Sequence, residues 1–224
     1  MNNEQKIIHS WQANAANWID IIDSNGIESR KIITNKAIVE AVCKAKPLSA
    51  LDMGCGEGWL SKELYTNGIA MTGVDVIPEL IEKANKKTIG NFFVASYEDI
   101  YLNKISFTTL FDAIVINFAL IGKESTENLL AFLPKLLTAT GKLFIQTLHP
   151  DSRKPMNDYE SGWKEGSWDG LGEQFSLPYQ WYFRTMEDWL LLFTRSGFNK
   201  INTIEVLHPH SGKPLSVIFE CSKD

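Results

Sequence analysis

The chain has 224 residues, a net charge of −5 from 22 basic and 27 acidic side chains, and 44% hydrophobic residues. This length fits one α/β domain that is large enough to bury a core. The acidic balance disfavours a nucleic-acid-binding protein, and no apolar run has the length that a bilayer requires. Three cysteines without a metal-ligand spacing and a polar start without a signal-peptide segment predict a cytoplasmic protein with reduced thiols.

The N-terminal segment is predicted to be helical. Trp11, Ala15 and Trp18 recur at spacings of three and four residues, which places them on one face of a helix. A tryptophan stripe of this kind docks a helix onto a core or onto a ligand.

The most informative segment is a glycine-rich turn after an apolar strand, Ser49–Met53. The turn contains Gly54, Gly56 and Gly58, and a helix is expected to open at Glu57. Glycines let the backbone approach a ligand where a Cβ atom would collide. About 20 residues further on, Asp75 ends the next strand, where its carboxylate can accept both hydroxyls of a ribose. This unit predicts a nucleoside site at the carboxyl ends of parallel strands.

The spacing of the glycines limits which kind of nucleoside ligand the site can bind. A dinucleotide fingerprint needs a glycine at the position of Trp59, so that pattern fails. Glu57 places a carboxylate at the helix start, which would repel a pyrophosphate. A ligand with a cationic sulfonium and an amino-acid tail meets no such objection.

Further along the chain, helical and strand patterns alternate, which predicts a parallel sheet covered on both faces. The expected helices are Pro78–Lys87, Glu124–Leu137 and Met186–Ser196. The expected strands are Asn91–Ala95, Asp112–Asn117, Lys142–Leu148, Lys200–Val206 and Leu215–Cys221.

Asp52 followed by Gly54, Gly56 and Gly58 resembles the first motif of the class I S-adenosylmethionine (SAM)-dependent methyltransferases. The turn before Lys142 and the segment from Arg184 to Phe198 resemble later parts of the same family. The resemblance implies an α/β fold with a doubly wound, mostly parallel, seven-stranded sheet in the order 3-2-1-4-5-7-6, the last strand antiparallel. It also implies a helical cap at 1–45. The chain length predicts one domain over residues 1–224, and the long connection at 150–183 predicts a substrate lid insertion.

The same resemblance assigns the cofactor contacts. The glycines face the methionine part, Asp52 orients their loop or binds the ammonium group through water, and Asp75 takes the ribose. The N-terminal helix closes over SAM, and Arg30 is a candidate partner of the methionine carboxylate; a solvent-exposed arginine is the alternative. The residues expected to contact the cofactor are Trp18, Arg30, Asp52, Gly54, Gly56, Asp75, Val76, Ile77, Ser96, Tyr97, Asn117 and Phe118.

The acceptor site is expected in the aromatic-rich lid and in the loops beside it. Candidate substrate contacts are Trp163, Trp168, Tyr182 and His208, although at least half of the lid rings are expected only to pack on one another. His149 follows the fifth strand directly and is the candidate general base; a histidine hydrogen-bonded within a turn is the alternative. His149, His208 and His210 do not have the spacing of a zinc site, so no metal is predicted.

These features predict an enzyme that transfers a methyl group from SAM to an oxygen, nitrogen or carbon nucleophile of a small molecule. The transfer is an in-line displacement that leaves S-adenosylhomocysteine. Two alternatives remain open at this point, a SAM-binding protein without transferase activity and a nucleotide-dependent oxidoreductase. The acceptor and the oligomeric state are not read from the sequence.

Overall fold

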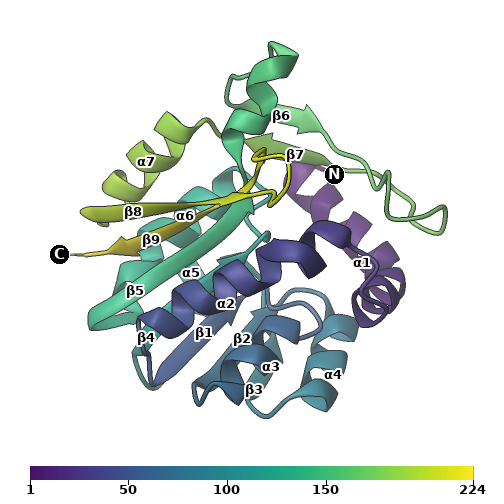
Figure 1. Ribbon diagram of the computed structural model, residues 1–224. Coiled ribbons are helices and arrows are strands. Elements are labelled where there is room, and N and C mark those ends of the chain that lie inside the picture. Colours follow the sequence, from purple (N-terminus) through teal and green to yellow (C-terminus); the bar gives the residue numbers. More distant parts are fainter. Residues whose placement is uncertain (224) are drawn as a thin grey trace.

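A seven-stranded sheet in the order β3-β2-β1-β4-β5-β9-β8 forms the centre of the computed structural model, which describes residues 1–223 (Figure 1). Strands β1 to β5 are parallel, and β9 runs antiparallel to both of its neighbours. The strands are β1 (Ser49–Met53), β2 (Ala70–Asp75), β3 (Asn91–Val94), β4 (Phe111–Asn117), β5 (Leu137–Leu148), β8 (Lys200–Leu207) and β9 (Pro214–Ser222). The predicted strand order and fold class are confirmed.

Helices cover both faces of this sheet, as buried parallel strands require. They are α1 (Asn3–Asp23), the π-helical η1 (Arg30–Thr34), α2 (Asn35–Lys44), α3 (Trp59–Thr66), α4 (Pro78–Lys87), α5 (Tyr97–Tyr101), α6 (Glu124–Phe132), the 3₁₀ turns η2 (Leu133–Lys135) and η3 (Pro150–Met156), and α7 (Met186–Arg195). A separate hairpin of β6 (Gly162–Glu165) and β7 (Gln180–Phe183) lies within the predicted lid.

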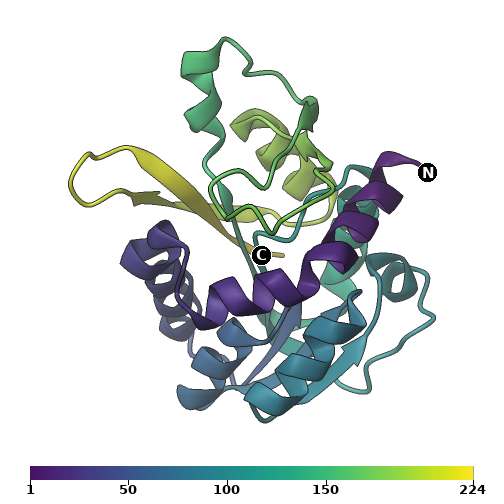
Figure 2. The same ribbon diagram turned by 90° about the vertical axis from the view of Figure 1, so that its right-hand side faces the viewer.

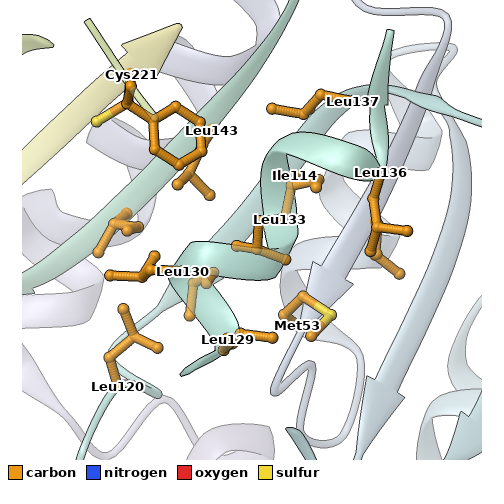
Figure 3. Close-up of a cluster of buried hydrophobic side chains, with 14 of the residues drawn as sticks. Met53, Ile114, Leu120, Leu129, Leu130, Leu133, Leu136, Leu137, Leu143 and Cys221 are labelled. Carbon is orange, nitrogen blue, oxygen red and sulfur yellow. The ribbon is translucent and has the colours of Figure 1, made fainter. Parts of the chain in front are cut away.

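The alternating side chains of the strands supply two cores. Ile114 and Ile116 point to one face and pack with Leu129, Leu130 and Leu133 of α6 and η2, part of which Figure 3 shows. Ala113 and Val115 point to the opposite face, where the buried side chains of α2, α3 and α4 meet them. Strand β4 is therefore apolar on both sides, which explains its near-continuous hydrophobic run.

The structure corrects two predicted boundaries. The helix after the glycine turn begins at Trp59, not at Glu57, because Gly58 has a left-handed backbone with φ 83° and caps the helix. The helix predicted over 124–137 ends at Phe132, and Pro134 lies in the following 3₁₀ turn. Since proline lacks the amide hydrogen that a helix interior needs, the chain turns early and β5 starts at Leu137 rather than at Lys142.

Helix α1 lies across the carboxyl edge of the sheet. Its 21 residues begin with a capping box formed by Asn2 and Gln5, and it packs against α4 on one side and β7 on the other. Figure 2 shows α1 between the layer of α3 and α4 and the green lid segment. The helix is therefore placed to contact both the glycine turn and the lid.

Candidate active site

The loops that follow β1 and β4 meet at the centre of the sheet. Gly54 has φ +72°, and a Cβ atom built on it would lie 2.6 Å from Ala119 Cβ and 2.8 Å from Tyr97 Oη. The amides of Gly54 and Cys55 both donate to the carbonyl of Val74 on β2, at 2.8 and 2.9 Å. These contacts hold the glycine turn at the point where the strand order of the sheet reverses. Ligands of doubly wound folds bind at this point.

Asp75 ends β2 beside this turn. Its Oδ2 accepts the amide of Gly56 at 2.9 Å, and its Oδ1 accepts the amide of Ile77 at 2.9 Å. Burial raises the pKa of Asp75 to about 6, against the effect of these backbone hydrogen bonds. A carboxylate has about four lone-pair positions, so two remain for a pair of hydroxyl donors.

Asp52 is fully buried, unlike Asp75, and it faces α3. Its Oδ2 accepts the hydroxyl of Ser61 at 2.7 Å. Burial, together with the negative charges of Glu57 and Asp75, raises the pKa of Asp52 to about 7, against the effect of the Ser61 hydrogen bond. The contact with Ser61 fits the expectation that Asp52 orients the glycine turn.

A chain of ion pairs that sequence reasoning missed connects three elements, and only its Glu57 end is fully buried. Glu57 in the glycine turn is 1% exposed in its side chain, and its Oε1 lies 3.4 Å from Lys87 Nζ at the end of α4. The same Nζ lies 3.1 Å from Oδ1 of Asp23 at the end of α1, and Lys83 binds the other oxygen of Asp23 at 2.7 Å. No local motif marks Lys87, since its partners lie 30 and 64 residues away.

Trp18 and Arg30 both reach the glycine turn. A Cβ atom built on Gly56 would lie 4.0 Å from Trp18 Nε1, so α1 covers the turn. The Arg30 guanidinium carbon lies 5.5 Å from the Trp18 ring centroid and 4.8 Å from that of Trp59, and Arg30 Nε donates to Asn35 at 3.2 Å. Its Nη2 is buried and has no hydrogen-bond partner among residues 1–223.

Burial lowers the pKa of Arg30, while the nearby charge of Glu57 raises it. The guanidinium also lines a cavity of about 560 Å³ between the end of α1 and helices η1, α2 and α3. A buried cation with an unpartnered N–H group is suited to an anionic ligand group.

Ser96 and Tyr97 begin α5 and have different surroundings. The Ser96 hydroxyl donates to Asp99 Oδ2 at 2.6 Å and accepts the Asp99 amide, so it caps the helix. The Tyr97 hydroxyl donates to the carbonyl of Ala119 at 3.2 Å, and burial raises its pKa well above the usual range. Tyr97 therefore lies between the loops after β1 and β4.

The edge of the candidate site also includes Val76, Ile77 and Phe118. Ile77 is buried with Leu80 and Ala15, and Val76 packs against this cluster together with Trp11 and Trp18. Phe118 has a left-handed backbone, φ 54°, and its amide donates to the carbonyl of Gln146 on β5 at 2.8 Å. Val76 and Ile77 form an apolar wall between α4 and α1, next to Asp75.

The lid and the N-terminal helix form one packed unit. Trp168 is buried with its ring centroid 5.0 Å from that of Trp11, and its Nε1 donates to Ser10 Oγ at 3.1 Å. Phe175 and Tyr179 pack on the other sides of Trp168, at 5.1 and 5.3 Å. Packing against α1 accounts for the position of Trp168.

The two remaining lid candidates lie on the hairpin. Trp163 and Tyr182 are opposite one another on β6 and β7, with ring centroids 5.5 Å apart, and both are half-buried. The amide of Tyr182 donates to the carbonyl of Ile121 at 2.8 Å, which connects the hairpin to the loop after β4.

His149 and His208 both cap local turns. His149 is 3% exposed, its Nδ1 accepts the amide of Asp151 at 3.2 Å, and its Nε2 lies 3.8 Å from Glu205 on β8. In the neutral ring the proton therefore sits on Nε2, which faces Glu205. His208 Nδ1 accepts the amides of His210 and Ser211 in the β8–β9 turn. Within residues 1–223, no group of three histidine, cysteine or acidic side chains is arranged to hold a metal ion.

A family model described as a methyltransferase domain matches residues 29–203, so the chain belongs to that family. The predicted class I SAM-dependent methyltransferase is thereby confirmed, and the match favours it over the oxidoreductase alternative.

Individual relatives are more distant. A ubiquinone biosynthesis O-methyltransferase from Xanthomonas oryzae pv. oryzae is 31% identical over 104 residues, which is 44% of this chain and 42% of that relative. The chain therefore matches less than half the length of that protein.

Two solved structures share the fold at 12% identity. A SAM-dependent methyltransferase from Clostridium acetobutylicum superposes with a TM-score of 0.65 over 99% of both chains. The glycopeptide N-methyltransferase MtfA, in complex with sinefungin, superposes with a TM-score of 0.63 over 84% of this chain and 85% of that one. Within the described residues, none of the helices is both long and apolar enough to span a bilayer.

Proposed function

We propose that this protein transfers the methyl group of SAM to a small-molecule nucleophile. The observation that carries this proposal is the position of Asp75, a half-buried carboxylate held by two backbone amides beside a glycine turn that Trp18 covers. Its remaining lone pairs match the two hydroxyls of a ribose. A small acceptor fits the lid, because its aromatic side chains enclose the same edge of the sheet.

The residues of the site suit the cofactor along its whole length. Asp75 would hold the ribose, and Val76 and Ile77 would lie against the adenine. The unpartnered Nη2 of Arg30 would bind the methionine carboxylate. Ser96 and Tyr97, which follow β3, would lie near the adenine, and the Tyr97 hydroxyl donates to the carbonyl of Ala119 in the loop after β4.

When bound, the cofactor supplies an electrophilic methyl group on a cationic sulfur. The protein has to align the nucleophile with this methyl group and exclude water, and positioning of this kind accounts for a large part of such catalysis. Helix α1 and the lid close the site from outside. A base from the protein is needed only where the acceptor must lose a proton before attack.

The base role of His149 stays a prediction that the contacts do not favour. Its Nδ1 is occupied by the amide of Asp151 and its Nε2 faces Glu205. These contacts are those of a residue that holds the turn after β5. We infer that His149 has a structural role.

We also propose, from the sequence, that the protein is cytoplasmic.

Calorimetric titration with SAM, S-adenosylhomocysteine and NADH tests the proposal. We expect micromolar binding of the first two ligands and none of NADH, and a loss of at least tenfold in SAM affinity for Asp75→Asn. Glu124→Gln, an exposed carboxylate on α6, is the control and should bind as the wild type does. Unchanged SAM binding by Asp75→Asn would remove the ribose assignment. SAM binding without methylation across a panel of amines, phenols and acids would favour the non-catalytic alternative.

A further inference from the structure

A row of polar side chains crosses the sheet at the carboxyl ends of β4 and β5. Asn117 and Gln146 are register partners on these parallel strands, so their side chains lie side by side on one face. Gln146 Nε2 donates to Ser216 Oγ on the next strand, β9, at 2.9 Å. Gln146 is 1% exposed and Ser216 is fully buried.

This polar row interrupts an apolar surface. The residues two positions earlier on the same strands, Val115 and Phe144, belong to the hydrophobic core under α2 and α3. Yet Asn117 Oδ1 and Gln146 Oε1 are buried and have no hydrogen-bond partner among residues 1–223. Two unpaired amide oxygens in a core are costly, and such local conflicts concentrate at functional sites.

The row lies next to the proposed methyl-transfer site. Ala119, two residues after Asn117, touches Gly54, and the Phe118 amide is bound to the carbonyl of Gln146. Helix α2, which packs against β4 and β5, follows directly after η1, the helix that carries Arg30. The two amide oxygens are thus near the end of the site where the methionine part of SAM is expected.

We propose that Asn117 and Gln146 hold a primary amine as the methyl acceptor. This inference rests on the proposed function and names its substrate class. Two acceptor oxygens match the two N–H groups of a neutral amine and leave its lone pair free for the methyl carbon. A hydroxyl has only one hydrogen to donate, and a carboxylate has none and would be repelled by both oxygens.

The reaction balances without a further reagent. The amine, an ammonium ion at neutral pH in solution, loses a proton to water on entering the site. Its nitrogen lone pair then forms the new bond to the methyl carbon, while the carbon–sulfur bond breaks and its electron pair stays on sulfur. The N-methylammonium product keeps its proton or returns it to water on release.

One-carbon probes test the site without knowledge of the rest of the acceptor. The protein saturated with S-adenosylhomocysteine is titrated with methylammonium, methanol and formate, and the side-chain amide signals of Asn117 and Gln146 are followed by ¹⁵N-resolved NMR. We expect both signals to shift with methylammonium at millimolar concentration and not with formate. An equal or larger response to formate would overturn the proposal, because it would show that amide N–H groups face the ligand.

Variants supply the second measurement. Asn117→Leu and Gln146→Leu should each reduce the methylammonium response at least tenfold, and Gln146→Met keeps the proposal testable where the leucine variant does not fold. Gln180→Leu, which removes an amide bound to Glu165 on the lid hairpin, is the matched control. Gln146→Leu, Gln146→Met and Gln180→Leu should each bind SAM within about threefold of the wild type by calorimetry, and Asn117→Leu is titrated at S-adenosylhomocysteine concentrations that saturate that variant. If the wild type does not bind SAM, the proposed function is contradicted. If Asn117→Leu and Gln146→Leu both keep the methylammonium response, only this inference is contradicted.

Discussion

Asn14 and Ser176 exchange two hydrogen bonds across 162 residues of sequence. Asn14 Nδ2 donates to the Ser176 carbonyl at 2.7 Å, and the Ser176 amide donates to Asn14 Oδ1 at 2.9 Å. Ser10 and Asn17, on the same face of α1, bind the carbonyls of Leu177 and Gln174. Because Trp18 of the same helix covers Gly56, the lid and the glycine turn are connected through α1.

Asn14→Leu should therefore release the lid. The substitution leaves the amide and the carbonyl of Ser176 without their partner, and we expect a loss of about 1–3 kcal/mol in the free energy of unfolding. Hydrogen exchange should accelerate at residues 168–179 before it does so in β4. Asn17→Ala removes one exposed hydrogen bond and is the control. An equal effect of the two substitutions would contradict the role assigned to Asn14.

Arg30→Met should weaken ligands that carry a methionine carboxylate. A hydrogen bond to a charged group contributes about 1.5–3 kcal/mol, so S-adenosylhomocysteine affinity should fall at least tenfold. 5′-Methylthioadenosine lacks the amino-acid tail and should bind the variant within twofold of the wild type, as calorimetry can measure. A parallel loss for both ligands would show that Arg30 only supports the packing of Trp18 and Trp59.

Lys87→Met should destabilise the fold, because it leaves the buried carboxylate of Glu57 without its cation. We expect a loss of up to about 3 kcal/mol in urea unfolding, given that Lys87 is itself partly exposed. The double variant Glu57→Gln/Lys87→Met should recover part of that loss, since it also removes the unpaired charge. A double variant as unstable as Lys87→Met alone would show that the two side chains do not interact.

Asp52 and Asp75 should make the ligand-free protein less stable as the pH rises. Their pKa values are raised, to about 7 for Asp52 and about 6 for Asp75, above the value of about 3.9 in an unfolded chain. The folded state therefore binds protons more tightly, and this contribution to stability is present below pH 4 and lost as the pH rises to 7. Thermal unfolding between pH 5 and pH 8 should show the decline, and Asp52→Asn should flatten it. If thermal stability falls with pH equally in the wild type and in Asp52→Asn, Asp52 is excluded as a cause of this pH dependence.

Much of the architecture was predictable from local pattern. The buried strands have apolar runs, the helices have amphipathic spacing, and the glycine turn with Asp75 identifies the switch point. The errors occurred where a single residue decides a boundary. Gly58 moved the helix start to Trp59, and Pro134 ended α6 early.

The sequence by itself determined the apolar strands, the amphipathic helices and the glycine motif, because these patterns are local, and the family resemblance of that motif implied the strand order. Only the tertiary structure decided that Lys87 neutralises Glu57, that Asn14 binds Ser176, and that Asn117 lies beside Gln146. Those contacts join residues from distant segments, and nothing in the local pattern marks them. They arise when the sheet and its helices pack, since packing alone brings these side chains within hydrogen-bond distance.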